Sequence, residues 1–340
     1  MTASHAMIFP GERIDISLEA SASPATYILG LKGLQDCRHL EHEAYIVYDD
    51  VDFNLKPNKD PESFDNDDYN FLERGYNCQT KNVICTLDLR ALEASDSTDS
   101  VDETLYIPFD VNTFSSYTDS MTDNKYNFYS SVYYPAYLSI GKETKIAQIN
   151  GLSFKYPSSP ILTQPDDTLE ELICTLEENS KKCVETPFFC ECIQIIEVPP
   201  HKTIEIILID EGFGGNASQT FHIHGYSVNV LGYDSFRREI RRDEVMAVDK
   251  VTPFARNVAD PLRKDSFVVP NKGYVILRFR ADNLGYWLWE ARSTGVSPEL
   301  MGPGMQFLMK IGSRESLPST PLNFPTCSNN KGLDLLFERN

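Results

Sequence analysis

The sequence predicts an all-β protein built as a sandwich or a Greek-key barrel. Val, Ile, Tyr and Phe recur in short runs in which apolar and polar residues alternate, the pattern of a strand with one buried face. Twenty prolines and eighteen glycines separate these runs, and stretches with helical periodicity are few. Short strands at regular spacing with turn residues between them are typical of sandwiches and barrels.

The N-terminal part of the chain divides into a strand-rich stretch and an acidic one. Residues 1–50 contain several alternating runs separated by proline, glycine and serine, so we expect strands there. In residues 51–103 hydrophobicity falls and acids accumulate, as in DFNLKPNKDPESFDNDDYN. This composition is typical of a linker, which we expect Cys78 and Cys85 to tie locally.

The strongest strand patterns lie in residues 104–312. The clearest runs are HKTIEIILID, YSVNVLGYD, DSFVVP and YVILRFRAD. Residues 235–245, SFRREIRRDEV, form a charge run that we expect to be a solvated loop, with contact to a partner as the alternative. Residues 313–340 are polar and rich in proline, so we expect a loosely ordered tail.

Composition and charge argue against several classes of partner. The hydrophobic content of 41% is ample for packed cores. The formal net charge of -19 argues against binding to nucleic acid or to an anionic membrane surface. No apolar run reaches the roughly 18 residues that a membrane-spanning helix requires, so we expect no membrane span.

The eight cysteines favour disulfides over a zinc site, because the chain contains no CxxC pair. Cys174 and Cys183 are plausible partners, although the overall connectivity stays open. If Cys190 and Cys192 lie on one strand, we do not expect them to pair with each other.

A glycosylation sequon also points to an exported protein. Asn216 opens an N-A-S triplet, which fits N-glycosylation at a surface loop. Disulfides and glycosylation both belong to oxidising, extracellular surroundings. The N-terminus of this chain shows no signal peptide, so we expect the natural protein to carry a preceding region.

The segment QTFHIHGY holds the best candidates for metal ligands. His222 and His224 are two residues apart in a predicted strand, so their imidazoles face one side while Ile223 faces the other. Imidazole pairs with this spacing suit copper or zinc. The alternative is a structural role in which backbone or carboxylate groups satisfy both rings.

Several separated motifs resemble the multicopper oxidases of the laccase type, and in particular arthropod laccases. TFHIHGYSVNVLGY and RNVADPLRKDSFVVPNKGYVILRFRADNLGYWLW resemble the family's last domain, and IFPGERIDISLEASASPATYILGLKGLQDC resembles its second. GLSFKYPSSPILTQPDD and FFCECIQIIEVPP look like the arthropod subgroup, and the resemblance covers nearly all of residues 5–312. It implies cupredoxin-like Greek-key barrels: a partial second domain in residues 1–50 and a complete third domain in residues 104–312. The first, N-terminal cupredoxin domain, with two of the family's four HxH motifs, is missing.

The resemblance implies roles for the residues of the first HxH motif. The family's H-P-F-H-L-H falls on residues 219–224. Its first histidine binds the mononuclear type 1 copper, and Gln219 stands at that position here. Its other two histidines bind the trinuclear copper cluster, and His222 and His224 keep those positions.

The family's second motif, H-C-H-x-x-x-H, has lost all of its ligands. Glu290 and Arg292 replace the two cluster histidines, and Ala291 and Val296 replace the type 1 cysteine and histidine. Met305 is a candidate remnant of the axial methionine, and core packing is its alternative role.

These replacements predict the loss of oxidase activity. In the family the cysteine thiolate is a soft copper ligand and also the electron path between the centres. Ala291 has no donor atom for either task. We therefore predict a pseudoenzyme without the copper-dependent oxidation of phenols and diphenols by dioxygen, and we expect no cofactor.

Two hypotheses describe the vestigial cluster positions. Glu290 and Arg292 should face His222 and His224, where a carboxylate and a guanidinium can form a hydrogen-bonded plug in place of the coppers. The alternative is that all four side chains are exposed leftovers.

The function predicted from the sequence is therefore binding or structural. The partner is an unidentified protein or a component of the extracellular matrix, and the resemblance implies secretion of the full-length product. The alternative is a protein that holds one copper or zinc ion at His222 and His224, or a residual oxidoreductase of the family.

Overall fold

The computed structural model describes residues 8–9, 11–33, 37–48, 87, 89–91, 100–115, 143–168, 170–176, 191–214, 217–291 and 304–327. The chain forms two compact units. One comprises Arg13–Arg74, and the other comprises Met1–Glu12 together with Gly75–Asn340. The predicted boundary at residue 50 and the pair Cys78 and Cys85 lie outside the described residues. Residue 103 is described and begins strand β3, and the predicted division into domains stays a prediction.

The smaller unit contains one antiparallel hairpin. Strand β1 (Thr26–Lys32) pairs along its whole length with β2 (Glu41–Val47). The Gly33 N–H donates to the carbonyl of Leu40 and closes the hairpin at 2.8 Å. Most side chains of both strands are exposed, as expected of a two-stranded sheet with no layer packed on it among its described residues.

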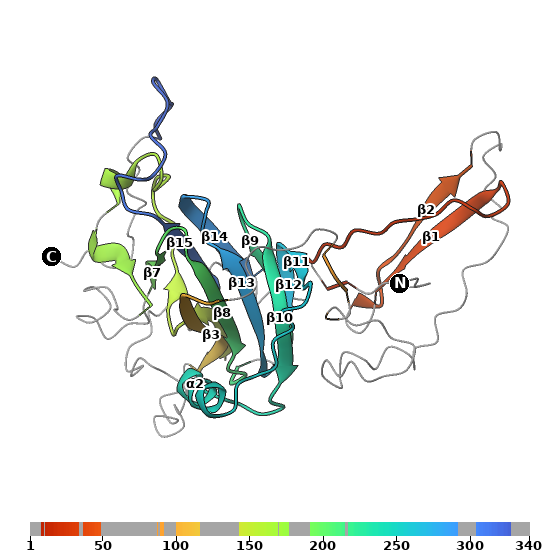
Figure 1. Cartoon of the computed structure of the whole chain (residues 1–340), viewed down its shortest axis with the longest axis horizontal. Coiled ribbons are helices and arrows are strands. Elements are labelled where there is room, and N and C mark those ends of the chain that lie inside the picture. Colours follow the sequence, from red (N-terminus) through yellow and green to blue (C-terminus); the bar gives the residue numbers. More distant parts are fainter. Residues whose placement is uncertain are drawn as a thin grey trace. The chain divides into compact units, whose positions relative to one another are not determined.

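The larger unit contains two sheets and confirms the predicted all-β, cupredoxin-like class. In the described residues, the first sheet has the strand order β11 (Leu262–Lys264), β10 (Val228–Ser235), β13 (Gly273–Arg280), β8 (Thr203–Asp210), β3 (Glu103–Ser115) and β4 (Glu143–Ile149) (Figure 1). The second has the order β12 (Ser266–Val269), β9 (Gln219–Ile223), β14 (Gly285–Ala291), β15 (Gln306–Ile311), β7 (Glu191–Val198) and β5 (Ser153–Phe154), with β6 (Ile173–Cys174) also paired to β7. Two short 3-10 turns, Pro165–Asp167 and Glu170–Leu172, precede β6. The four runs with the strongest strand patterns form β8, β10, β12 and β13, as predicted.

The main core lies between the two sheets. β8 contributes Ile204, Ile206 and Leu208 from the first sheet, and β9 contributes Phe221 and Ile223 from the second. Every residue of β8 is buried, because its other face is also covered. This explains why β8 reads as a nearly continuous apolar run rather than a clean alternation.

A helix covers the outer face of the first sheet. Helix α2 (Arg242–Val251) packs Val245 against Ile207 and Ile209 of β8 in a second apolar cluster (Figure 1). The charge run 235–245 is therefore only partly a loop, because its last four residues begin this helix. The prediction of a solvated loop was wrong there, since Val245 supplies the buried anchor and the basic residues lie on the solvent side.

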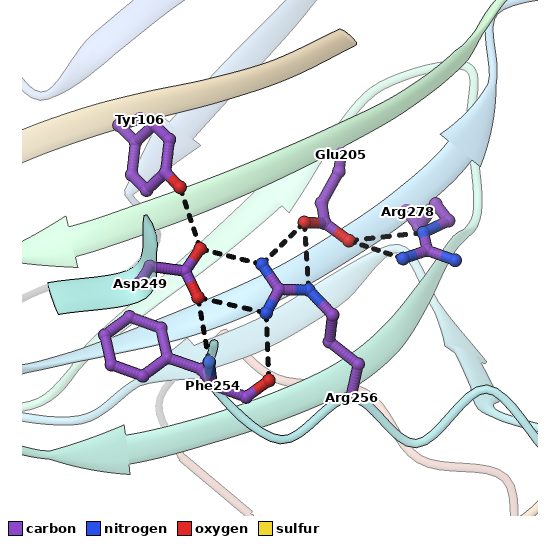
Figure 2. A network of polar contacts seen from close by, with 6 residues as sticks. All are labelled: Tyr106, Glu205, Asp249, Phe254, Arg256 and Arg278. Atoms are coloured by element: carbon purple, nitrogen blue, oxygen red, sulfur yellow. Dashed lines mark hydrogen bonds and ion pairs between the residues drawn. The ribbon is translucent and has the colours of Figure 1, made fainter. Parts of the chain in front are cut away.

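A polar network fastens α2 and the following loop to the sheet (Figure 2). Asp249 of α2 accepts a hydrogen bond from the Tyr106 hydroxyl at 2.7 Å and two from the Arg256 guanidinium at 3.1 and 2.9 Å. Arg256 also donates to Glu205 of β8, which accepts from Arg278 of β13 as well. Burial is the largest single influence on the pKa of Asp249 and would raise it, but the hydrogen bonds from Arg256, Phe254 and Tyr106, together with the charge of Arg256, lower the pKa overall.

One disulfide lies among the described residues, and it differs from the expected pairing. Cys174 bonds to Cys192, with 6.0 Å between the Cα atoms. The expected partner of Cys174, Cys183, lies outside the described residues. β6 and β7 run parallel and bring Cys174 beside the buried start of β7, a pairing that sequence spacing does not reveal.

Replacing both Cys174 and Cys192 by alanine should lower the free energy of unfolding by about 3 kcal/mol, because the bond closes a loop in the unfolded chain. Urea unfolding of the variant and the parent measures the change. Cys327→Ala is the matched control, since Cys327 is exposed and unbonded, and its unfolding curve should match that of the parent. Equal effects of the two variants would show that the disulfide does not stabilise the fold.

Candidate functional site

The candidate site lies on three neighbouring strands of the second sheet. β9 pairs antiparallel with β14 on one side and with β12 on the other. In this register His222 lies directly opposite Glu290 of β14 and opposite Ser266 of β12. Residues that face each other across paired strands share one face of the sheet, so these three side chains belong to one surface.

Strand alternation separates the two sets of vestigial copper positions. Phe221 of β9 points into the main core, and Gln219, two residues before it, lies on the same face with 9% of its surface exposed. Ala291 lies opposite Phe221 and packs against the core, where Met305 is 4% exposed. The type 1 positions in the described residues therefore face the core, and Met305 is a packing residue there. His222 faces the other way.

His224 and Glu290 form a direct contact. The Nε2 atom of His224 lies 3.1 Å from Oε1 of Glu290, and the two side chains are 43% and 19% exposed. The backbone N–H of His224 donates to the carbonyl of Leu288, which fixes the residue beside β14 just after β9 ends. An imidazole N–H that donates to a carboxylate makes a charge-assisted hydrogen bond.

His222 is held by the turn that precedes β12. Its Nδ1 atom lies 2.9 Å from the carbonyl oxygen of Asp265 and 3.1 Å from Oγ of Ser266. A carbonyl oxygen only accepts, so the Nδ1 atom carries the proton in this contact. The same carbonyl also accepts from the N–H of Ile223 at 2.9 Å. His222 is 12% exposed, and the backbone of Asp265, 43 residues away in the sequence, holds its ring.

The two imidazole rings lie side by side on this surface. Their centroids are 4.8 Å apart and the ring planes make an angle of 64°. Tyr156 lies near the same acid: burial, and then the charge of Glu290, raise the pKa of its phenol. The structure thus brings together His222, His224 and Glu290, while the His224 side chain stays 43% exposed. The plug and the alternative of exposed side chains without a role both stay predictions.

Other predicted site residues lie outside the described residues. These are Arg292, Val296 and the sequon asparagine Asn216. Their predicted roles stay predictions. Sequence analysis also missed Asp265 and Ser266, because their link to His222 depends on the pairing of β12 with β9, which no local pattern encodes.

Metal binding by the described residues has limited geometric support. No group of three or more His, Cys, Asp or Glu side chains in this part of the chain is arranged to hold a metal ion. Ala291 presents no donor atom at the position of the family's cysteine, so the residues present do not fit a type 1 copper. In the same residues, no helix is both long and apolar enough to cross a membrane.

Comparisons with known proteins agree with the resemblance in the sequence. Residues 144–308 match the family model of multicopper oxidases. Over these residues the chain resembles the multicopper oxidases, and it is laccase-like. It is 34% identical to Laccase-9 of Arabidopsis thaliana over 130 residues, which are 38% of this chain and 20% of that laccase. It is 24% identical to Laccase-10 of the same plant over 196 residues, which are 54% of this chain and 32% of that laccase.

Solved structures of the family resemble the laccase-like protein at low sequence identity. Fet3p, a multicopper oxidase that functions in iron import, has a TM-score of 0.45 at 14% identity and covers 84% of this chain, with 44% of its own chain matched. A laccase from Botrytis aclada has a TM-score of 0.38 at 15% identity, over 66% of this chain and 30% of its own. The matches to the plant laccases span only a fifth to a third of those proteins. Assignment to the arthropod subgroup stays a prediction.

Proposed function

We propose that this laccase-like protein is a pseudoenzyme that acts by binding or in a structural role, without copper-dependent oxidase activity. The observation that carries the proposal is the contact between His224 and Glu290. A cluster histidine of the family would bind copper, whereas this imidazole contacts a carboxylate on the neighbouring strand at 3.1 Å.

The type 1 positions support the same conclusion. Electron transfer from a phenol requires a copper that accepts one electron at a time, held in this family by a cysteine thiolate and histidines. Ala291 and Gln219 stand at two of these positions, on the core-facing side of the sheet. A methyl group and an amide cannot replace a thiolate and an imidazole as copper ligands, so we expect no electron entry site.

The vestigial cluster face supports a polar plug. A buried imidazole that lacks a partner costs roughly 1–3 kcal/mol, and the Asp265 carbonyl provides the partner for His222. His224 is more exposed, and Glu290 is its partner at 3.1 Å. We expect Arg292 to complete the plug, and we expect the protein to hold no copper.

The partner and the location follow from chemistry rather than from a site. The net charge of -19 disfavours polyanions, so we propose a protein or matrix partner. The disulfide between Cys174 and Cys192 fits an oxidising compartment, and we propose an extracellular protein.

Metal analysis and an oxidase assay test the pseudoenzyme. We expect the purified chain to contain no stoichiometric copper, to show no blue absorption and to consume no oxygen with a diphenol. A laccase assayed alongside should contain copper, show the blue absorption and consume oxygen. Stoichiometric copper together with oxygen consumption would refute the proposal.

Metal titration separates the polar plug from the single-metal alternative. We expect neither copper nor zinc to bind saturably, and His224→Ala to behave like the parent. The alternative is a site for one metal ion, which the proximity of His222, His224 and Glu290 supports. It predicts that metal binding of micromolar or tighter affinity is lost in His224→Ala and kept in the control His42→Ala. That result would refute the plug.

A further inference from the structure

The chain crosses from the first sheet to the second at a single residue, Asp265. Strand β11 ends at Lys264 and β12 begins at Ser266, so Asp265 alone connects the two strands. Its carbonyl oxygen accepts from the N–H of Ile223 at 2.9 Å and lies 2.9 Å from Nδ1 of His222. The position of this crossover therefore decides the direction of the His222 ring.

The crossover is tied to both sheets. On one side Lys264 lies opposite Val228 of β10, a fully buried residue. On the other side Ser266 lies opposite His222 of β9. Because β9 and β10 are consecutive strands, the crossover holds both ends of residues 224–227, which connect them.

Strand β11 makes few contacts of its own. It has three residues, lies at the edge of the first sheet and pairs with β10 alone among the described strands. A short edge strand with one neighbour opens at low cost, because few hydrogen bonds have to break. The crossover therefore needs a further contact to stay in place.

The side chain of Lys264 supplies this contact. Its ammonium group pairs with Oε1 of Glu12, which lies 252 residues earlier in the sequence. Both side chains are buried, with 9% and 8% of their surfaces exposed. A buried ion pair is sensitive to the loss of one partner, because the remaining charge is then left without compensation.

Glu12 is itself fixed by a tight turn. Its N–H donates to the carbonyl of Phe9 at 2.9 Å, and its Oε2 atom accepts from the N–H of Phe9 at 3.1 Å. Gly11, within the turn, has a φ of 78°, which glycine adopts without steric cost. The other carboxylate oxygen, Oε1, is the one that meets Lys264. Glu12 is thus a preorganised anchor, and it belongs to the same compact unit as Lys264.

We propose that Glu12 is a positioning residue for the candidate site, because it holds Lys264 and thereby the carbonyl that orients His222. The contacts run from the Glu12 carboxylate to the Lys264 ammonium, along the backbone to Asp265, and from the Asp265 carbonyl to the ring. The inference rests on the polar plug of the proposed function, and it extends the His222 part of that plug to the N-terminal segment.

Hydrogen exchange of the full chain tests this role. In Glu12→Ala the Lys264 ammonium loses its buried carboxylate, so protection of the Ile223 amide should fall at least about tenfold. Central amides of β8 should keep their protection, because β8 lies in the middle of the first sheet. Nitrogen NMR should show the His222 proton on Nδ1 in the parent and shared between both ring nitrogens in the variant.

Glu197→Ala is the matched control. It also removes the glutamate of a Glu–Lys pair, with Lys310 at 2.7 Å, but Glu197 is 66% exposed and the pair lies on β7 and β15, which are not neighbours of β12. This variant should leave the Ile223 amide and the His222 ring unchanged. Equal losses of protection in all strands of Glu12→Ala, or no loss at Ile223, would overturn the positioning role.

Lys264→Met tests the other partner of the ion pair. Methionine keeps an unbranched side chain and removes the charge, so Glu12 is left buried without a cation and protection of Ile223 should fall again. When Glu12→Gln and Lys264→Met are combined, both charges are gone, and the fall should be smaller than the sum of the two single falls. Additive falls would contradict an action through the ion pair. Stoichiometric copper in the parent would refute the pseudoenzyme, whereas unchanged Ile223 protection in Glu12→Ala would refute only the positioning role.

Discussion

Replacing Glu205 by alanine should lower the free energy of unfolding by about 3–5 kcal/mol. Glu205 is 2% exposed and lies between two guanidinium groups. Its Oε1 atom accepts from Nε and Nη2 of Arg256 at 3.0 and 2.8 Å, and its Oε2 atom accepts from Nη2 of Arg278 at 2.6 Å (Figure 2).

The loss is large because both arginines keep their charge. Without Glu205 the Arg278 side chain, 6% exposed, loses its carboxylate partner in a space that excludes water. Arg256 keeps Asp249, so α2 should remain attached, although the loop that carries Arg256 should loosen. Urea unfolding measures the free energy, and hydrogen exchange locates the loosened segment.

Glu197→Ala is the matched control for this prediction. Glu197 also lies on a strand and pairs with Lys310 at 2.7 Å, but its side chain is 66% exposed. An exposed ion pair contributes up to about 1 kcal/mol, so this variant should unfold almost like the parent. Equal losses in the two glutamate variants would contradict the importance of burial.

The strands could be predicted where one physical requirement dominates. β10 and β13 place an apolar residue at every second position toward the main core, as Val228 and Val230 or Val275 and Leu277 do, and this pattern shows in a single sequence. Helix α2 could not be predicted, because its buried contacts are few and its charged residues look like a loop. Val245 and Asp249 gain their meaning only from their partners on the sheet.

The site shows the same division between local and long-range information. Alternation along β9 correctly predicts that His222 and Ile223 face opposite sides, because this follows from strand geometry alone. The contact between His224 and Glu290 was anticipated from the resemblance, which aligned the two motifs. The carbonyl of Asp265 at His222 was not anticipated, since only the register of β12 against β9 places it there.

Replacing Trp289 by alanine should also lower the free energy of unfolding by about 3–5 kcal/mol. Trp289 is fully buried in β14, immediately before Glu290, and its ring stacks on Phe307 with centroids 5.3 Å apart. Phe267 makes an edge contact with the same ring, with centroids 5.9 Å apart. Alanine leaves a cavity between the sheets that these two rings cannot fill, so the site strand loses its anchor.

Trp289→Phe separates ring packing from the indole N–H. The Nε1 atom of Trp289 is buried without a hydrogen-bond partner in the described part of the chain. Phenylalanine removes this unsatisfied donor, worth roughly 1–3 kcal/mol, and keeps much of the stacking, so its loss should be well below that of alanine. Trp287 is the other tryptophan of the chain, and its Nε1–H donates to the Asn283 carbonyl at 2.8 Å. Its fluorescence therefore still reports unfolding in both variants. A phenylalanine variant as unstable as the alanine variant would show that the N–H has a partner and that the core depends on the complete indole.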